Sequence, residues 1–207
     1  MEEIKPLIST NEVIASSAKK TSSFSMKSEE KEHDFFLSDG YKEFSNIFKS
    51  IEKNKTYTFV SFGQWSLKHV VFHILNLIGK CDIYSTTYGL GASTARGIAI
   101  AVNKGLINSF HFLYDFKIKA YKPEAHDICS NNFDVKVANI HAKVTVLKNE
   151  NYSVIITGSS NWSDTNDKIE INEIRENKEL AEFHINWILK VMKLESTNPK
   201  ELLHGIQ

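Results

Sequence analysis

The chain has little cysteine and no excess of charge of either sign. Only two of its 207 residues are cysteines, Cys81 and Cys129, which excludes a disulfide framework and a C-x-x-C metal or redox pair. We expect both thiols to be reduced and partly buried. The 25 Lys and Arg residues balance 25 Asp and Glu residues, so bulk positive charge cannot hold a nucleic acid, and any anion site must be local.

Long hydrophobic runs are also absent. The N-terminal residues 1–13 contain no apolar stretch fit for a signal peptide. No later stretch reaches the ~18 apolar residues of a membrane-spanning helix. The sequence therefore predicts a cytoplasmic protein without a membrane span. Apolar residues make up 42% of the chain and charged residues 24%, which is typical of a globular protein with one sizeable core.

The first 40 residues differ in composition from the rest. Ser, Thr, Lys and Glu account for 21 of them, and such a segment buries too little apolar surface to offset its ordering entropy. We expect residues 1–40 to form a mobile N-terminal arm, with short structure around 7–14, that could dock a protein partner. Residues 41–207 are expected to form the folded domain.

Helix and strand patterns alternate through that domain, which predicts an α/β fold. We expect a layered α-β-α sandwich with a mixed, largely parallel sheet. The expected strands are 57–62, 81–88, 110–116, 133–147 and 153–157, and the expected helices are 67–78 between Ser66 and Gly79, about 93–104, about 124–130 and a final helix after Asn177 with an apolar stripe over 180–194.

The chemically informative segment is NIHAKVTVL, residues 139–147. Strand alternation places His141, Lys143 and Thr145 on one face. The next strand leads into TGSSNWS, residues 157–163, where Ser159 and Asn161 lie two apart. If the two strands pair, an imidazole, an ammonium, a hydroxyl and an amide converge, a set that fits the charge of a phosphodiester.

These residues also resemble a known family. H-A-K followed by G-S-S-N is similar to the H-x-K(x4)D(x6)G-S-x-x-N signature of the phospholipase D-like phosphodiesterases, in the shortened G-S-x-N form of its small bacterial endonucleases. Glu170, twelve residues after Gly158, matches the Glu of the family's N-x-E strand, although Lys168 stands where that Asn would be. Lys148 occupies the position of the motif's Asp, and the spacing to the glycine is three residues longer.

The resemblance implies a covalent mechanism. His141 would attack phosphorus to give a phosphohistidine, while Lys143 and Asn161 hold the phosphoryl oxygens and Ser159 assists. Glu170 would accept a hydrogen bond from the other ring nitrogen of His141, with Glu173 as the fallback for that role.

The same mechanism needs a second histidine, and this chain has one H-x-K. We therefore expect a homodimer that shares its active site, with the second His141 as proton donor. No metal and no cofactor are implied.

The implied substrate is DNA, because the single motif and the lack of a lipid-binding segment match the nuclease branch of the family. Gly158 and Trp162 are candidate substrate contacts, and for Trp162 stacking on a base and covering the core remain equally open. Two alternatives stand beside the nuclease: a catalytically weak nucleic-acid-binding or assembly module, suggested by Lys148, and a phospholipid hydrolase or transferase.

Two other patterns are interpreted as structural. His69 and His73 lie one helical turn apart, but Val70 replaces the Glu of H-E-x-x-H and no third ligand is evident. The GLGAST segment, residues 89–94, follows a strand and opens a helix, and Thr94 replaces the third glycine of a dinucleotide fingerprint. A plain turn is favoured there over a phosphate site.

Overall fold

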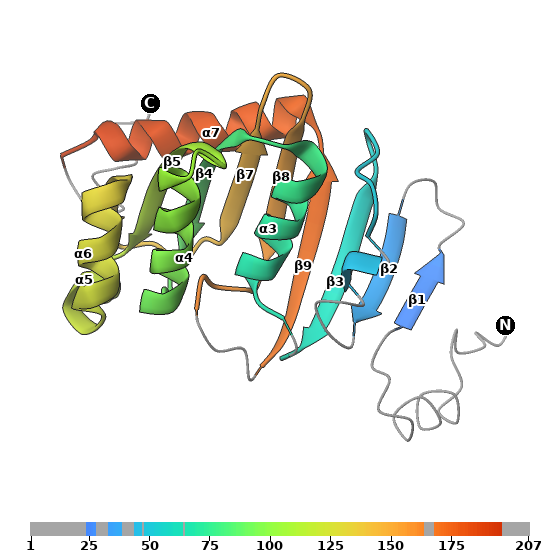
Figure 1. Cartoon of the computed structure of the whole chain (residues 1–207), viewed down its shortest axis with the longest axis horizontal. Helices are drawn as coiled ribbons and strands as arrows, with labels where there is room; N and C mark the ends of the chain where they lie inside the picture. Colours follow the sequence, from blue (N-terminus) through green and yellow to red (C-terminus); the bar gives the residue numbers. More distant parts are fainter. Residues whose placement is uncertain are drawn as a thin grey trace, which may run out of the picture.

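The computed structural model describes residues 44–46, 48–63, 65–163 and 168–195, and the backbone of residues 24–27 and 33–38. Within them a sheet of nine strands is flanked by helices on both faces (Figure 1). The strands are β1 (Phe24–Lys27), β2 (His33–Ser38), β3 (Thr56–Phe62), β4 (Cys81–Thr87), β5 (Ile107–Asp115), β6 (Asp134–Ala138), β7 (Val144–Lys148), β8 (Ser153–Gly158) and β9 (Ile169–Glu176), and the helices are α3 (Leu67–Ile78), α4 (Ala92–Asn103), α5 (Phe116–Tyr121), α6 (Pro123–Asn132) and α7 (Lys178–Lys193).

The sheet is mixed, with the order β1-β2-β3-β9-β8-β7-β4-β5-β6. The strands β2, β3, β8, β4, β5 and β6 run in one direction, and β1, β9 and β7 run in the other. Most strands are thus parallel in direction, as predicted. Most neighbouring pairs are nevertheless antiparallel, because β9 and β7 are interleaved between strands of the opposite direction.

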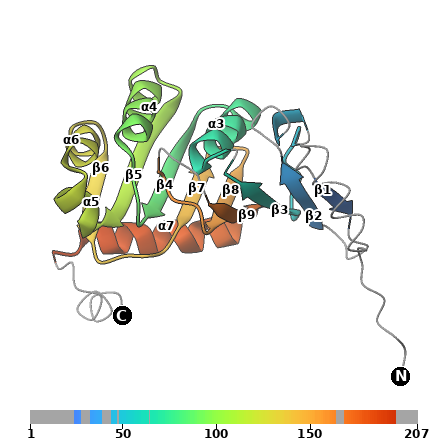
Figure 2. The ribbon, with the colours of Figure 1, turned by 90° about the horizontal axis from the view of Figure 1, so that it is seen from below.

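Helices α3, α4 and α6 lie over one face of the sheet and α7 lies over the other, so the predicted three-layer sandwich is confirmed (Figure 2). The larger core fills the α3 and α4 side and includes Trp65, Phe112 and Trp162. On the α7 side, valines of β7 pack against Ala181 and Ile185. No helix in the described part of the chain combines the length and the apolar composition that crossing a membrane requires.

Local sequence signals place the helix ends. Helix α3 begins after Ser66 and ends before Gly79, whose φ of 79° favours glycine. Helix α7 is capped by Asn177, whose side-chain oxygen accepts the Leu180 N–H at 2.8 Å. Both ends agree with the sequence prediction. Cys81 and Cys129 are unpaired and fully buried, and burial raises the pKa of each thiol to about 12.

The strands predicted over 133–147 and 110–116 differ from those in the structure. The first is divided into β6 and β7, which are not neighbours in the sheet, and residues 139–143, with His141 and Lys143, belong to no strand. Strand β5 ends at Asp115, which caps the short helix α5 by accepting the Lys117 N–H at 3.0 Å, so residue 116 begins a helix and does not end a strand. Strands β1 and β2 fall within the predicted arm, and β2 pairs in parallel with β3. The short structure expected around 7–14 lies outside the described residues.

Gly158 is required by the close packing of β8 against β9. A Cβ built there would lie 2.2 Å from the Ile171 carbonyl oxygen and 2.8 Å from the Asn172 Cα. Gly97, within α4, has room for a Cβ, with only the Lys68 side chain 3.8 Å away.

We therefore predict opposite effects of two glycine substitutions. Gly158→Ala should destabilise the fold by about 1–3 kcal/mol because β9 must move. Gly97→Ala should stabilise it by about 0.5–1 kcal/mol because alanine loses less backbone entropy in a helix. Urea unfolding monitored by circular dichroism measures both changes, and equal effects of the two substitutions would contradict the packing described here.

Candidate active site

His141 and Lys143 lie in the segment 139–143, which connects β6 to β7 and belongs to no strand. Two buried side chains hold this segment. The Thr86 hydroxyl on β4 donates to the Ala142 carbonyl at 3.0 Å and accepts the Val144 N–H at 3.1 Å. The Asp115 carboxylate at the end of β5 accepts the Ile140 N–H at 3.2 Å. The segment is therefore fixed at the edge where β4 and β5 end, the lower edge of the sheet in Figure 1.

The predicted alternation is confirmed within β7 for residues 144–146. Val144 and Val146 pack on the α7 side. Thr145 lies on the other side, with its hydroxyl 2.8 Å from that of Ser85. His141 and Lys143 lie before the strand, so their positions follow from the hydrogen bonds of the segment 139–143 and not from strand alternation.

Lys143, His141 and Tyr88 form one cluster. The Lys143 Nζ lies 3.4 Å from His141 Nδ1 and 3.1 Å from the His141 carbonyl oxygen. It also lies 5.9 Å from the centre of the Tyr88 ring, and that ring is 4.6 Å from the His141 ring. Partial burial lowers the pKa of Lys143, against the opposing effect of the Glu170 carboxylate, which favours the charged amine.

Glu170 and Ser159 form a second polar pair at the same edge. The Ser159 hydroxyl donates to Glu170, and the Ser159 oxygen accepts the Ile171 N–H at 3.0 Å. The carboxylate is buried, and in the described part of the chain no hydrogen bond joins it to His141. Glu170 thus meets Ser159 directly and Lys143 through charge, whereas the resemblance implied a bond to the His141 ring.

Glu173, the fallback for Glu170, is excluded by strand alternation. It lies three residues along β9 from Glu170 and therefore on the opposite face of the sheet. There its carboxylate accepts a hydrogen bond from Arg175 at 3.2 Å. Its charge is already paired with that guanidinium.

The GLGAST turn positions Asn161. The Asn161 side-chain oxygen accepts the Gly89 N–H at 3.0 Å and the Thr87 hydroxyl at 3.3 Å. The Gly91 N–H donates to the Trp162 carbonyl at 3.0 Å. The N–H groups of Gly89 and Gly91 thus donate to other residues of the chain and not to a ligand. This agrees with the interpretation of 89–94 as a turn. Because Asn161 accepts through Oδ1, its N–H groups are what it offers to a ligand.

Trp162 and Gly158 have structural explanations in place of the substrate contacts predicted for them. Trp162 is fully buried, and its indole N–H donates to the Ser85 hydroxyl at 2.8 Å. Its ring therefore covers the core and is not exposed for stacking on a base. The backbone that approaches Gly158 closely is that of β9.

Lys148, which replaces the motif's Asp, lies at the other end of β7 from the site, about 13 Å along the strand. Its Nζ lies 2.8 Å from a Glu182 carboxylate oxygen on α7, and this hydrogen bond lowers the pKa of Glu182. Lys148 therefore adds no charge to the His141 edge.

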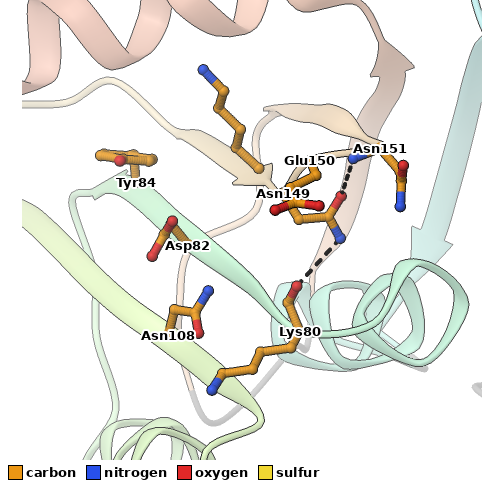
Figure 3. Close-up of a pocket in the computed structure, with 8 residues that line it drawn as sticks. Lys80, Asp82, Tyr84, Asn108, Asn149, Glu150 and Asn151 are labelled. Carbon is orange, nitrogen blue, oxygen red and sulfur yellow. Dashed lines mark hydrogen bonds between the residues drawn. The ribbon is translucent and has the colours of Figure 1, made fainter.

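The same distant end holds a polar cavity of 660 Å³, lined by Lys80, Asp82, Tyr84, Asn108 and residues 148–151. In Figure 3, Asn149 links the Lys80 carbonyl to the Asn151 amide across its wall. None of the predicted site residues lines this cavity. The candidate site lies instead at the opposite end of these strands, where β4, β5 and β8 end.

Sequence reasoning missed Tyr88 and Lys117. The Lys117 Nζ donates to the Tyr88 hydroxyl at 2.6 Å and lies 5.0 Å from its ring centre. This hydrogen bond raises the pKa of Lys117. The available signal was the run FKIKAYK, residues 116–122, which interleaves aromatic residues with lysines.

Metal ligands do not gather in the described residues. No group of three or more His, Cys, Asp or Glu side chains there is arranged to hold a metal ion. His69 instead accepts the Ser66 N–H on its ring at 3.1 Å, and His73 lies 2.5 Å from the Phe48 carbonyl. Both histidines thus have the structural roles expected of them.

The partly buried Lys143 should cost the fold stability while it is charged. The pKa of Lys143 in the folded protein lies below the ordinary 10.5. Between these two pKa values the unfolded chain binds more protons than the folded one, so the stability of the fold rises with pH over this interval. The destabilisation by the charged amine is therefore complete at pH 7 and is relieved as pH rises through the folded pKa. Lys143→Met should therefore melt at an equal or higher temperature than wild type at pH 7, with a gap that narrows toward pH 10. Lys104→Met, at an exposed lysine, provides the control. A Lys143→Met variant less stable than wild type at pH 7 would contradict this reasoning.

The comparison with solved structures gives similar chains, whereas the other two comparisons give none. No family model and no curated protein match the chain. Among solved structures, NucT from Helicobacter pylori is similar, with a TM-score of 0.48 and 14% sequence identity, over 66% of this chain and 95% of that chain. At this identity no residue's role passes from one chain to the other.

Proposed function

We propose that the chain is a metal-independent phosphodiesterase of the phospholipase D-like type, a nuclease whose nucleophile is His141. The observation that carries the proposal is the Lys143 ammonium held 3.4 Å from the His141 ring, at the edge where Asn161 and the Ser159–Glu170 pair also lie. The ammonium and the amide match the oxygens of a phosphodiester, and a neutral imidazole beside them is a suitable nucleophile.

The reaction proceeds in two displacements. A lone pair of the His141 ring attacks phosphorus, a P–N bond forms, and the P–O bond to the leaving oxygen breaks. A second imidazolium gives that oxygen its proton. The same imidazole, now neutral, then takes a proton from water as the water oxygen attacks phosphorus and the P–N bond breaks. Lys143 and Asn161 hold the phosphoryl oxygens throughout.

The second imidazole comes from a second copy of the chain. The other histidines with described side chains have hydrogen-bond partners elsewhere; these are His69, His73, His111, His126 and His184. A two-fold pair of chains would bring two His141 rings together. The open position of His141, which is solvent-exposed, is compatible with this arrangement.

The position of Lys148 supports a nuclease over a catalytically weak binding module. The concern was that a cation replaces the motif's Asp, but this lysine is paired with Glu182 at the far end of β7. Phospholipid hydrolysis is the alternative function, because a phospholipid head group is also held by a phosphodiester. Release of a head group from vesicles without any cleavage of DNA would favour it.

Replacing His141 should greatly reduce the rate of hydrolysis. We predict that His141→Ala lowers the rate on bis(4-nitrophenyl) phosphate and on DNA by about 10²–10⁴-fold, with excess chelator present throughout. His184→Ala, on α7 at the opposite face of the sheet, is the matched control and should retain activity. Activity that disappears with chelator, or that survives in His141→Ala, would refute the proposal.

Dimer formation should be needed for that activity. We predict that wild-type protein sediments as a dimer at concentrations where specific activity is full, and that specific activity falls on dilution below the dissociation constant of the dimer. A monomer with undiminished activity would exclude a shared site.

Glu170 should control the alkaline limit of activity. Its carboxylate favours the charged form of Lys143, so Glu170→Gln should lower the Lys143 pKa further and move the alkaline fall of kcat/KM to lower pH. The amide oxygen of the substituted side chain can still accept the Ser159 hydroxyl. Glu173→Gln, on the opposite face of β9, should leave the alkaline limit unchanged. If both variants share the wild-type profile, the Lys143 charge does not set that limit.

A further inference from the structure

The run Phe116–Lys122, helix α5 and the residue after it, forms an exposed surface next to the His141 edge. We name the side chains Phe116, Lys117, Lys119, Tyr121 and Lys122 the α5 surface. Tyr121 is 76% exposed and Phe116 is 47% exposed, whereas Ile118 is buried and anchors the helix. What distinguishes the two exposed aromatic side chains is that they lie on one six-residue helix among lysines.

The charge of this surface is of one sign. Three lysines and no acidic residue occur in 116–122, in a chain whose net charge is zero. The flanking acids are already engaged: Asp115 is buried and accepts backbone N–H groups, and Glu124 is paired with Arg96 at 2.6 Å. The lysines of the α5 surface therefore form a local cationic patch.

The α5 surface is continuous with the candidate active site. Lys117 donates to the Tyr88 hydroxyl at 2.6 Å, and the Tyr88 ring lies 4.6 Å from that of His141. Lys117 and Lys143 thus approach the same ring, at 5.0 and 5.9 Å from its centre. A polyanion bound at Lys143 would meet Lys117 next.

We infer that the α5 surface binds a single-stranded nucleic acid that extends from the His141 centre. Lys117, Lys119 and Lys122 contact phosphates that flank the scissile one, and Tyr121 stacks on an unpaired base. The inference rests on the proposed function for the position of the scissile phosphate. A single strand fits because its bases expose faces on which an aromatic ring can stack, whereas those of a duplex are stacked inside it.

The test measures binding of a fluorescent oligothymidylate strand and of a matched duplex over a range of salt concentrations. The full chain carries His141→Ala so that the strand is not cut. Lys119→Ala/Lys122→Ala should reduce the slope of log K against log salt by about 1.4, since each phosphate contact on a single strand contributes about 0.7. Lys190→Ala/Lys193→Ala, which removes two lysines of the same spacing from α7, should leave the slope unchanged.

Tyr121 supplies the second readout. Tyr121→Ala should weaken strand binding about tenfold through loss of stacking, Tyr121→Phe should restore it, and duplex binding should change little. An unchanged slope in Lys119→Ala/Lys122→Ala, or equal losses for strand and duplex, would overturn the inference. It would also be overturned if these variants lose binding to phosphatidylglycerol vesicles while strand binding is retained.

Hydrolysis of bis(4-nitrophenyl) phosphate separates this inference from the proposed function. That small diester fits the His141 centre without reaching α5, so the α5 variants should hydrolyse it at the wild-type rate. Wild-type protein that binds the strand at α5 but hydrolyses no diester would refute the proposed function alone. Normal diester hydrolysis with unaltered strand binding in the α5 variants would refute the α5 inference alone.

Discussion

The hydroxyl group of Thr86 is the contact on which the geometry of the candidate site depends. The segment that carries His141 and Lys143 precedes β7 and has no strand pairing of its own. Thr86, which is 1% exposed, bonds the backbone on both sides of Lys143, through Ala142 and Val144. The bond from Val144 is buried and the bond to Ala142 is partly buried, so water competes little for them. Two solvent-accessible functional groups are in this way fixed to the interior of the sheet.

The two lysines of the β7 region illustrate how a chain with no net charge builds a local anion site. Lys148 is paired with Glu182 on α7. Lys143 lies at the other end, partly buried, with its hydrogen bonds directed to His141 and a carboxylate near enough to favour its charge. The Lys117 ammonium adds a second positive charge near the site, because it donates to the hydroxyl of Tyr88, whose ring Lys143 also approaches. Position within the fold, and not the number of basic residues, creates the electrostatic field at this edge.

Local patterns in the sequence were sufficient for the elements with strong periodicity or clear caps, but not for contacts between distant segments. Helices α3 and α7 follow from their apolar stripes and caps, and the three layers follow from the alternation of helices and strands. The insertion of β9 between β3 and β8 is a matter of non-local pairing, which no window of residues contains. Glu170 contacts Ser159 because β8 ends beside β9. Trp162 is held in the core by a hydrogen bond to Ser85, which is far away in the chain. Helix α5 was missed because six residues are too few for a periodic signal.

The most direct test of the account is to identify the covalent intermediate. The protein would be incubated with a phosphodiester substrate and excess chelator, quenched under alkaline conditions that preserve phosphohistidine, and digested for mass spectrometry. The account predicts an adduct on His141 that forms and decays at the rate of turnover. Turnover with no adduct, or an adduct on another residue, would contradict it.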